Sequence, residues 1–143
     1  MSDNAFVDSN IWLYAFFLRD GEEALHERAK ALIEMPLRYV ISDQVIAEVS
    51  SNLLRKASMA EGGLVEIVTS FYSRCHVVSP SHEMHLKASR LRTQHQFSYW
   101  DSLIVAAALE AGCSVLYSED MQDGQVIDGT LSIRNPLTAP TLA

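Results

Sequence analysis

The chain has 143 residues, with 18 acidic and 11 basic side chains and a formal net charge of −7 at pH 7. This length suits one ordinary domain with its own core. The negative charge argues against a protein that binds nucleic acid through a broad positive surface. No apolar run approaches the roughly 20 residues needed to span a bilayer, and the first residues do not resemble a secretory signal. We therefore expect a cytoplasmic protein, not associated with a membrane, that carries one active site.

Short apolar runs rich in β-branched residues alternate along the chain with longer segments of helical spacing. The expected strands cover residues 5–8, 39–42, 76–79 and 114–118. The expected helices cover residues 10–19, 22–35, 43–58, 61–73, 81–95 and 101–112. A further pair of short apolar runs flanks Asp128 and Gly129, at residues 125–127 and 131–133. This pair predicts a short edge strand or a turn.

The alternation of strands and helices predicts an α/β fold with a parallel sheet covered by helices on both faces. The expected architecture is a three-layer α/β/α fold whose central, mainly parallel sheet has four to five strands. We expect it to occupy residues 1–134 as a single domain. Residues 135–143 include Pro136 and Pro140 and are expected to form an extended, poorly held C-terminal tail.

Asp8 is the first of several acidic residues whose position in the expected fold suggests chemistry. It follows the apolar run Phe6-Val7, so it lies at the carboxyl end of the first expected strand. Ligands bind at that edge in open parallel sheets. An ordinary alternative has equal weight, because Asp8 or Ser9 can simply cap the helix that follows.

Glu48 and Asp101 lie at positions where either a structural or a functional role is reasonable. Glu48 falls on the edge of the apolar face of its helix, from where a carboxylate can reach into a cleft. The alternative for Glu48 is an ordinary pairing with Arg55 or Asn52. Asp101 opens the apolar helix 101–112, where a negative charge suits the free amides and the helix dipole without any function.

A third group of acids follows the last long strand. Glu119 and Asp120 come directly after Ser118, and Asp123 comes one short turn later. For any one of these acids, a solvated surface loop is the alternative. Their position at a strand end is the informative part, because it is the same edge of the sheet at which Asp8 lies.

Asp8, Asp101 and Asp120 therefore fall at strand ends or adjoining helix starts of one sheet edge, with Glu48 within reach. Carboxylates that converge repel one another unless cations lie between them. Oxygen-rich sites suit Mg²⁺ or Mn²⁺. Such ions activate a water and neutralise the charge that develops on a phosphodiester. The acids together favour a magnesium or manganese site.

Taken in order, these segments of the sequence resemble the PIN-domain family. They are Phe6-Val7-Asp8, the helical Glu48, Tyr99-Trp100-Asp101 and Ser118-Glu119-Asp120. The resemblance covers roughly residues 4–128. It implies a compact α/β/α fold with metal-dependent ribonuclease activity. Many bacterial members of this length resemble VapC toxins of type II toxin–antitoxin systems, and this chain is similar to them.

The resemblance also implies roles for individual acids. Asp8, Glu48 and Asp101 match the three core acids of the family, and Asp120 matches the fourth. Asp8, Asp101 and Asp120 are the expected metal ligands. Glu119 occupies a variable position of the motif, which leaves open whether Glu119 or Asp120 faces the metal. We favour Asp120.

Other residues near these acids have expected supporting roles. Ser9 and Ser118 are expected to orient carboxylates or a metal-bound water through hydrogen bonds. Asp123 matches a further, less regular acid of the family. Candidates for contacts with phosphate are Arg55, Lys56, Arg90 and Arg92, although a solvated helix face is the more common place for any one of them.

The expected partners follow from the resemblance and from one aromatic cluster. The resemblance implies an RNA substrate, with tRNA as a family-level expectation, and a small antitoxin protein. Trp12, Tyr14, Phe16 and Phe17 crowd the first expected helix. Core packing is the leading interpretation of these rings, but aromatic residues are also enriched in protein interfaces. The alternative for these rings is contact with a partner chain or an antitoxin helix, and a homodimer is expected as well.

Three other functions remain as alternatives. A non-catalytic PIN-like binding or regulatory module would keep the fold without cutting, and the complete set of acids counts against it. A housekeeping RNA-processing nuclease would use the same chemistry without being a toxin. A phospho-accepting receiver domain would need a lysine after a late strand, and the chain has no lysine beyond Lys87.

Overall fold

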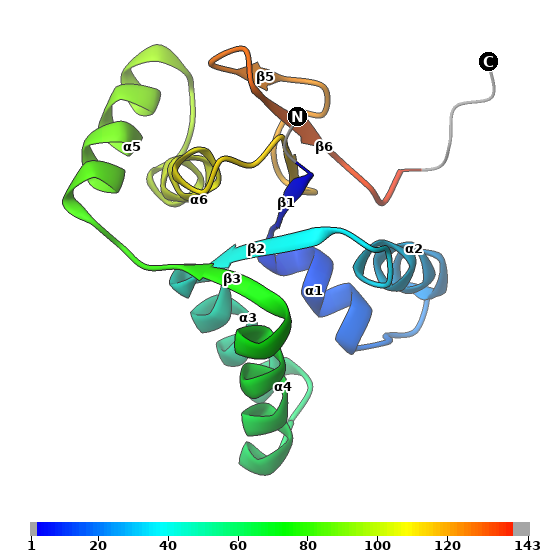
Figure 1. Ribbon diagram of the computed structural model, residues 1–143. Coiled ribbons are helices and arrows are strands. Elements are labelled where there is room, and N and C mark those ends of the chain that lie inside the picture. Colours follow the sequence, from blue (N-terminus) through cyan, green and yellow to red (C-terminus); the bar gives the residue numbers. More distant parts are fainter. Residues whose placement is uncertain (1–2, 139–143) are drawn as a thin grey trace.

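The computed structural model describes residues 3–138, and its centre is a six-stranded sheet (Figure 1). The strands are β1 (Asn4–Val7), β2 (Arg38–Ser42), β3 (Cys75–Val78), β4 (Val115–Tyr117), β5 (Val126–Ile127) and β6 (Leu131–Arg134). Their order across the sheet is β3-β2-β1-β4-β6-β5. Every neighbouring pair is parallel except β5 and β6. The expected mainly parallel sheet is confirmed.

The sheet has six strands rather than four or five because the last two apolar runs form a hairpin. Asp128 and Gly129 have φ angles of 52° and 68°, and the main-chain N–H of Thr130 donates to the carbonyl of Ile127 at 3.1 Å. Two successive residues of positive φ are what the tightest hairpin turns require. Because β6 also pairs with β4, this hairpin extends the sheet.

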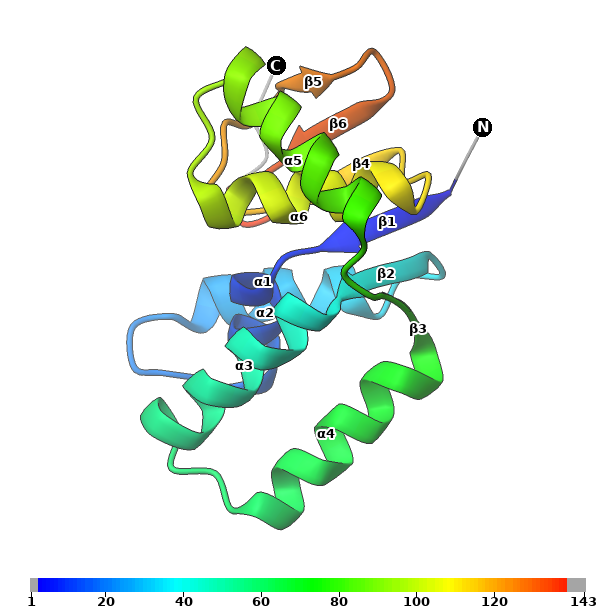
Figure 2. The same ribbon diagram turned by 90° about the vertical axis from the view of Figure 1, so that its left-hand side faces the viewer.

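Between residues 3 and 138, six helices surround the sheet. They are α1 (Ser9–Phe16), α2 (Glu23–Ile33), α3 (Asp43–Lys56), α4 (Glu61–Arg74), α5 (His82–Gln94) and α6 (Tyr99–Glu110). Helices α5 and α6 pack together on one face, while α1, α2 and α3 lie on the other (Figure 1). Figure 2 shows α3 and α4 projecting side by side from the second face. The three-layer α/β/α architecture is therefore confirmed. In the range 3–138, no helix combines the length and apolar character that crossing a bilayer would require.

Serine caps define the starts of three helices. Ser42 caps α3, Ser81 caps α5 and Ser98 caps α6, each by accepting a hydrogen bond from a main-chain N–H three residues later. Such caps satisfy amides that have no partner within the helix. The cap at Ser98 moves the start of α6 two residues ahead of the expected start at Asp101. Asp101 consequently lies in the first turn, where its N–H donates to Ser98 Oγ at 3.1 Å.

The core lies on both sides of β1. Residues Ala5–Val7 are completely buried, and α6 is buried from Ser102 to Ala108. Trp12 is also completely buried, and its indole N–H donates to the carbonyl of Val7 at 3.0 Å. Core packing is thus confirmed for Trp12. This bond fixes α1 against the carboxyl end of β1, and Asp8 is the next residue after that end.

The C-terminal segment differs from the expected extended tail as far as it is described. Residues 136–138 form a turn and a bend, and Leu137 is only 3% exposed. The Arg28 guanidinium donates to the Leu137 carbonyl at 2.8 Å, and the main-chain N–H of Asn135 donates to Asp123 at 3.0 Å. Burying one leucine against the core holds this segment in place. Residues 139–143 of the expected tail lie outside the described residues.

Candidate active site

Asp8 is a buried carboxyl group at the carboxyl end of β1. Its side chain accepts a hydrogen bond from the Ser9 N–H at 2.8 Å, and Ser118 Oγ donates to its other oxygen at 2.9 Å. Burial raises the pKa of Asp8 to about 6, although these two hydrogen bonds oppose the rise. The nearby negative charges of Glu48 and Asp101 add to it. Asp8 therefore caps α1 and is also a buried acid where the strands of the sheet have their carboxyl ends.

Glu48 reaches from α3 toward Asp8. Ser9 Oγ donates to Glu48 Oε2 at 2.8 Å and lies 3.4 Å from Asp8 Oδ1. Gln44 Nε2 donates to the other oxygen of Glu48 at 2.8 Å. The ordinary alternative was a pairing with Arg55 or Asn52. Asn52 contacts the main-chain carbonyl of Glu48 rather than its carboxylate, and Arg55 donates to Asn52. The side chain of Glu48 is thus oriented by Ser9 and Gln44.

Asp101 and Asp120 approach the same edge from α6 and from the loop after β4. Both line a hollow of about 240 Å³. Burial raises the pKa of Asp101, and the negative charges of Asp120 and Glu48 raise it further. Asn10 Nδ2 donates to Asp120 Oδ2 at 2.9 Å, which ties this loop to α1. The four expected catalytic acids therefore come together at one edge of the sheet.

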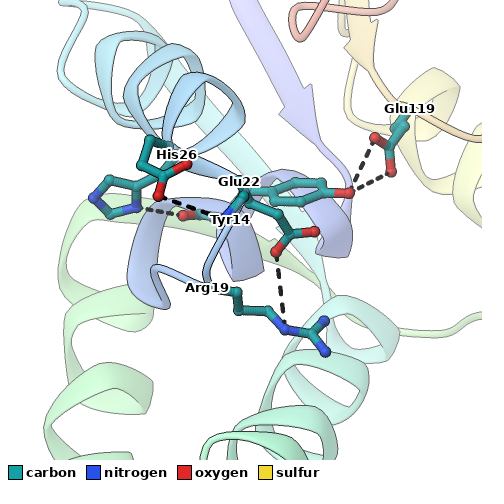
Figure 3. Close-up of polar contacts among 7 residues, drawn as sticks. Tyr14, Arg19, Glu22, His26 and Glu119 are labelled. Atoms are coloured by element: carbon teal, nitrogen blue, oxygen red, sulfur yellow. Dashed lines mark hydrogen bonds and ion pairs between the residues drawn. The ribbon is translucent and has the colours of Figure 1, made fainter.

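Glu119 points toward Tyr14 of α1, as Figure 3 shows. The Tyr14 hydroxyl lies 3.2 Å from both carboxylate oxygens of Glu119 and donates to them. Burial and the charge of Glu119 raise the pKa of Tyr14 to about 12, so this hydroxyl keeps its proton at neutral pH. The same figure places Arg19 and Glu22 nearby, 3.8 Å apart between Nε and Oε1. Of the two neighbouring acids, Asp120 is the one that shares a hollow with Asp101.

The comparison with known families gives a direct result. The sequence profile of the PIN domain matches residues 5–122. The chain belongs to the PIN-domain family. A comparison with curated proteins by sequence found no significant match.

Several solved structures resemble this PIN domain. VapC20 of Mycobacterium tuberculosis, described as a sarcin-ricin loop cleaving toxin, has a TM-score of 0.66 and 21% identity, over 81% of this chain and 89% of that chain. A toxin–antitoxin complex from Klebsiella pneumoniae has a TM-score of 0.68 and 21% identity, over 92% and 97%. DNA-bound VapBC from Salmonella typhimurium has a TM-score of 0.64 and 18% identity, over 95% and 99%. At these identities, the likeness shows a shared fold.

The acids of this PIN domain fit a hard divalent cation by their donor chemistry. Asp8, Glu48, Asp101 and Asp120 offer only carboxylate oxygens, which are the ligands that Mg²⁺ and Mn²⁺ prefer. Within residues 3–138, no three acidic, histidine or cysteine side chains form a ready-made metal-binding group. Mg²⁺ typically takes few direct carboxylate ligands and completes its coordination with waters.

Three other residues that the sequence analysis considered have partners within the protein. The main-chain N–H of Asn135 donates to Asp123, so Asp123 holds the C-terminal segment. Arg90 forms an ion pair with Asp128 at 2.8 Å. Arg92 Nη1 donates to the buried Ser102 hydroxyl at 2.7 Å. The Arg90 pair lies on the exposed face of α5, whereas the Arg92 contact with Ser102 is part-buried.

Two residues that orient the acids were not predicted from the sequence. Asn10 contacts Asp120, and Gln44 contacts Glu48. Gln44 had a usable signal, because residues four apart on a helix are neighbours and a glutamine can bond to an acid at that spacing. The bond between Asn10 and Asp120 joins positions 110 residues apart. Local spacing carries no signal for such a contact.

Proposed function

We propose that this PIN-domain protein is a divalent-metal-dependent endoribonuclease that hydrolyses RNA phosphodiester bonds and acts as the toxin of a toxin–antitoxin pair. The observation that carries the proposal is the buried carboxyl of Asp8, held by Ser9 and Ser118 with Glu48 and Asp101 close enough to raise its pKa. Placing several carboxylates around a buried acid is unfavourable unless a proton or a cation offsets their charge. Such perturbed acids favour a functional site over a structural one.

The proposed chemistry divides the acids into two roles. Asp8, Asp101 and Asp120 would hold the metal, which when bound neutralises phosphate charge and activates a water. Ser9 and Ser118 bond to both oxygens of Asp8 and so restrict its rotation. Orientation of this kind supports the ligands of a metal.

Glu48 has a different proposed role from the three metal ligands. Its Oε2 accepts a hydrogen bond from Ser9 and its Oε1 accepts one from Gln44. Both bonds hold the carboxylate beside Asp8, where it can accept the proton of an attacking water. Asn10 gives Asp120 a comparable support from α1.

The proposed partners are an RNA, a small antitoxin and a second copy of the chain, in the cytoplasm. The support for an antitoxin is fold similarity to the Klebsiella pneumoniae toxin–antitoxin complex and to the Salmonella typhimurium VapBC complex. tRNA remains the family-level candidate for the substrate. A non-catalytic module is less favoured, because the full set of acids is supported by hydrogen bonds that a binding role would not need.

A cleavage assay tests the enzymatic part of the proposal. Purified protein should cut RNA in Mg²⁺ or Mn²⁺, lose this activity in excess chelator, and regain it when the metal is restored. Asp8→Asn, purified in the same way, controls for contaminating nucleases. Calorimetric titration with Mn²⁺ alone should show binding to the parent protein and weaker binding to Asp8→Asn. Undiminished cleavage by the parent protein in excess chelator contradicts the mechanism.

A growth experiment separates a toxin from a housekeeping nuclease. Expression of the protein alone should arrest growth, and co-expression of the neighbouring small reading frame should relieve the arrest. Asp101→Asn, expressed at the same level, should be harmless. If the folded, expressed parent protein leaves growth unchanged while cutting RNA in vitro, the housekeeping alternative is the better one.

A further inference from the structure

We propose that Trp100 is a stacking platform for an RNA base beside the bond that is cut. The inference rests on the proposed ribonuclease function and deepens it by naming a residue that positions the substrate. Every base has an aromatic face, so stacking on a side-chain ring binds single-stranded RNA without reading its sequence. The platform would therefore add affinity for RNA rather than specificity for one base.

The exposure of Trp100 is the first observation. Trp100 is 63% exposed, whereas Trp12, the other tryptophan of the chain, is completely buried. Its neighbour Tyr99 is 48% exposed. A large ring left in solvent offers apolar area that a partner can cover. Two such rings in succession form an aromatic surface at the start of α6.

The rigid support of this surface is the second observation. The Tyr99 and Trp100 rings meet edge to face at 5.1 Å between centroids. The Arg92 guanidinium lies 4.9 Å from the centre of the Tyr99 ring. Gln44 Nε2 lies 3.4 Å from the Trp100 carbonyl and donates to it. A ring that is already held in place loses less conformational entropy when it binds.

The position of Trp100 relative to the acids is the third observation. Trp100 and Glu48 line the same hollow of about 430 Å³, together with Gln44. Gln44 contacts both the Glu48 carboxylate and the Trp100 carbonyl, and Asp101 is the next residue along the chain. A base stacked on Trp100 would bring its own phosphate toward the acids. Trp100 is thus connected to the candidate active site through one shared side chain.

The charge of the protein favours this kind of contact. The formal net charge is −7, so general attraction of phosphate contributes little to RNA binding. Arg90 and Arg92 are engaged with Asp128 and with Ser102 and Tyr99, respectively. Stacking does not depend on net charge. It gives an acidic ribonuclease a way to hold its substrate that electrostatics alone does not provide.

The first experiment locates the bound base by fluorescence. A short single-stranded RNA is titrated with Mg²⁺ into Asp120→Asn protein, which should leave the RNA uncut. Stacking should quench the exposed Trp100 while the buried Trp12 continues to emit. An abasic oligomer of the same length keeps the phosphates but lacks bases, and it should bind more weakly and cause little quenching. Equal binding and equal quenching by the abasic oligomer overturn the proposal.

The second experiment measures affinity and cleavage in variants. Trp100→Ala should bind labelled RNA about fivefold to 150-fold more weakly, as expected for the loss of ~1–3 kcal/mol of stacking. Trp100→Phe keeps a ring and should recover part of this loss. In cleavage assays, the KM of Trp100→Ala should rise with little change in kcat. Melting curves verify that each variant is folded.

Tyr72→Ala provides the matched control. Tyr72 is 59% exposed, but it lies on α4, which both ribbon views place well apart from α6 (Figures 1 and 2). It should bind and cut RNA as the parent protein does. If Trp100→Ala also keeps the parent KM and affinity while the parent cuts RNA, Trp100 is not a platform and the ribonuclease proposal stands. If the parent neither binds nor cuts RNA, the proposed function fails and this inference fails with it.

Discussion

The hydroxyl of Ser9 donates a 2.8 Å hydrogen bond to Glu48 and thereby joins the start of α1 to α3. The same hydroxyl lies 3.4 Å from Asp8. One small side chain therefore lies between two carboxylates that come from different parts of the sequence. Because Ser9 lies beside both acids, its loss should change how both are oriented.

Ser9→Ala should lower RNA cleavage by about 10-fold to 100-fold, the usual range for losing a residue that orients a metal ligand. The acids themselves remain, so some activity should persist. Cleavage rates and Mn²⁺ affinity are the measurements. Ser73→Ala is the control, because Ser73 is exposed and its hydroxyl donates only within α4, to the Ser70 carbonyl. A parent-like rate for Ser9→Ala contradicts a role for this bridge.

Amide substitutions of the four acids test the site directly. Asp8→Asn, Glu48→Gln, Asp101→Asn and Asp120→Asn each keep the shape of the side chain while removing a charge. Each should reduce cleavage sharply, because a ligand or a proton acceptor is lost. Folding should survive, and relief of repulsion among the acids should raise the melting temperature in metal-free buffer.

Glu119→Gln is the matched control for this series. Glu119 accepts hydrogen bonds from Tyr14 and should retain most of the cleavage activity when it becomes an amide. Activity and melting should be measured on the same samples. If Glu119→Gln is inactive and Asp120→Asn is active, Glu119 rather than Asp120 completes the site. Early melting with parent-like cleavage would identify an acid as a structural cap only.

The pH dependence of stability should carry the signature of Asp8. Its pKa is about 6 in the folded protein against an ordinary value of 3.8. The folded state thus holds the proton more tightly, so the stability contributed by protonated Asp8 is complete below pH 3.8 and is lost as pH rises through about 6. The loss amounts to roughly 3 kcal/mol, since each unit of pKa corresponds to about 1.36 kcal/mol.

Asp8→Asn has no such proton to lose. In metal-free buffer, the melting temperature of Asp8→Asn minus that of the parent should therefore increase between about pH 4 and pH 7. Adding Mn²⁺ at pH 7 should stabilise the parent more than the variant. A melting difference that stays constant over this pH range would show that Asp8 is not the titrating group.

Arg92→Ala should act mainly on stability. The substitution removes a 2.7 Å hydrogen bond to the buried Ser102 and the contact with the Tyr99 ring, with an expected loss of about 1–3 kcal/mol. Arg90→Ala on the same helix breaks a more exposed pair with Asp128 and should cost less than about 1 kcal/mol. If Arg92→Ala melts normally and instead reduces the salt dependence of RNA binding, Arg92 is a phosphate contact.

The order of elements could be predicted from the sequence because it depends on local pattern. The short apolar run at residues 5–8 has a length typical of a buried strand, and the longer apolar run around Ala106 has a length typical of a buried helix. Asp8 directly follows its strand, so its place at the sheet edge follows from the parallel topology. The start of α6 was less predictable, because Ser98 competes with Asp101 as its cap.

Only the tertiary structure decided which neighbouring acids belong together. Glu119 and Asp120 are adjacent in sequence, yet one meets Tyr14 and the other meets Asn10, both on α1. Asp123, in the same loop, has a third partner, because it accepts a hydrogen bond from the main-chain N–H of Asn135. Side-chain direction in a loop is set by contacts with residues far away in the sequence, and spacing along the chain does not encode those contacts. A local pattern can therefore place an acid at the sheet edge, but only packing determines what that acid faces.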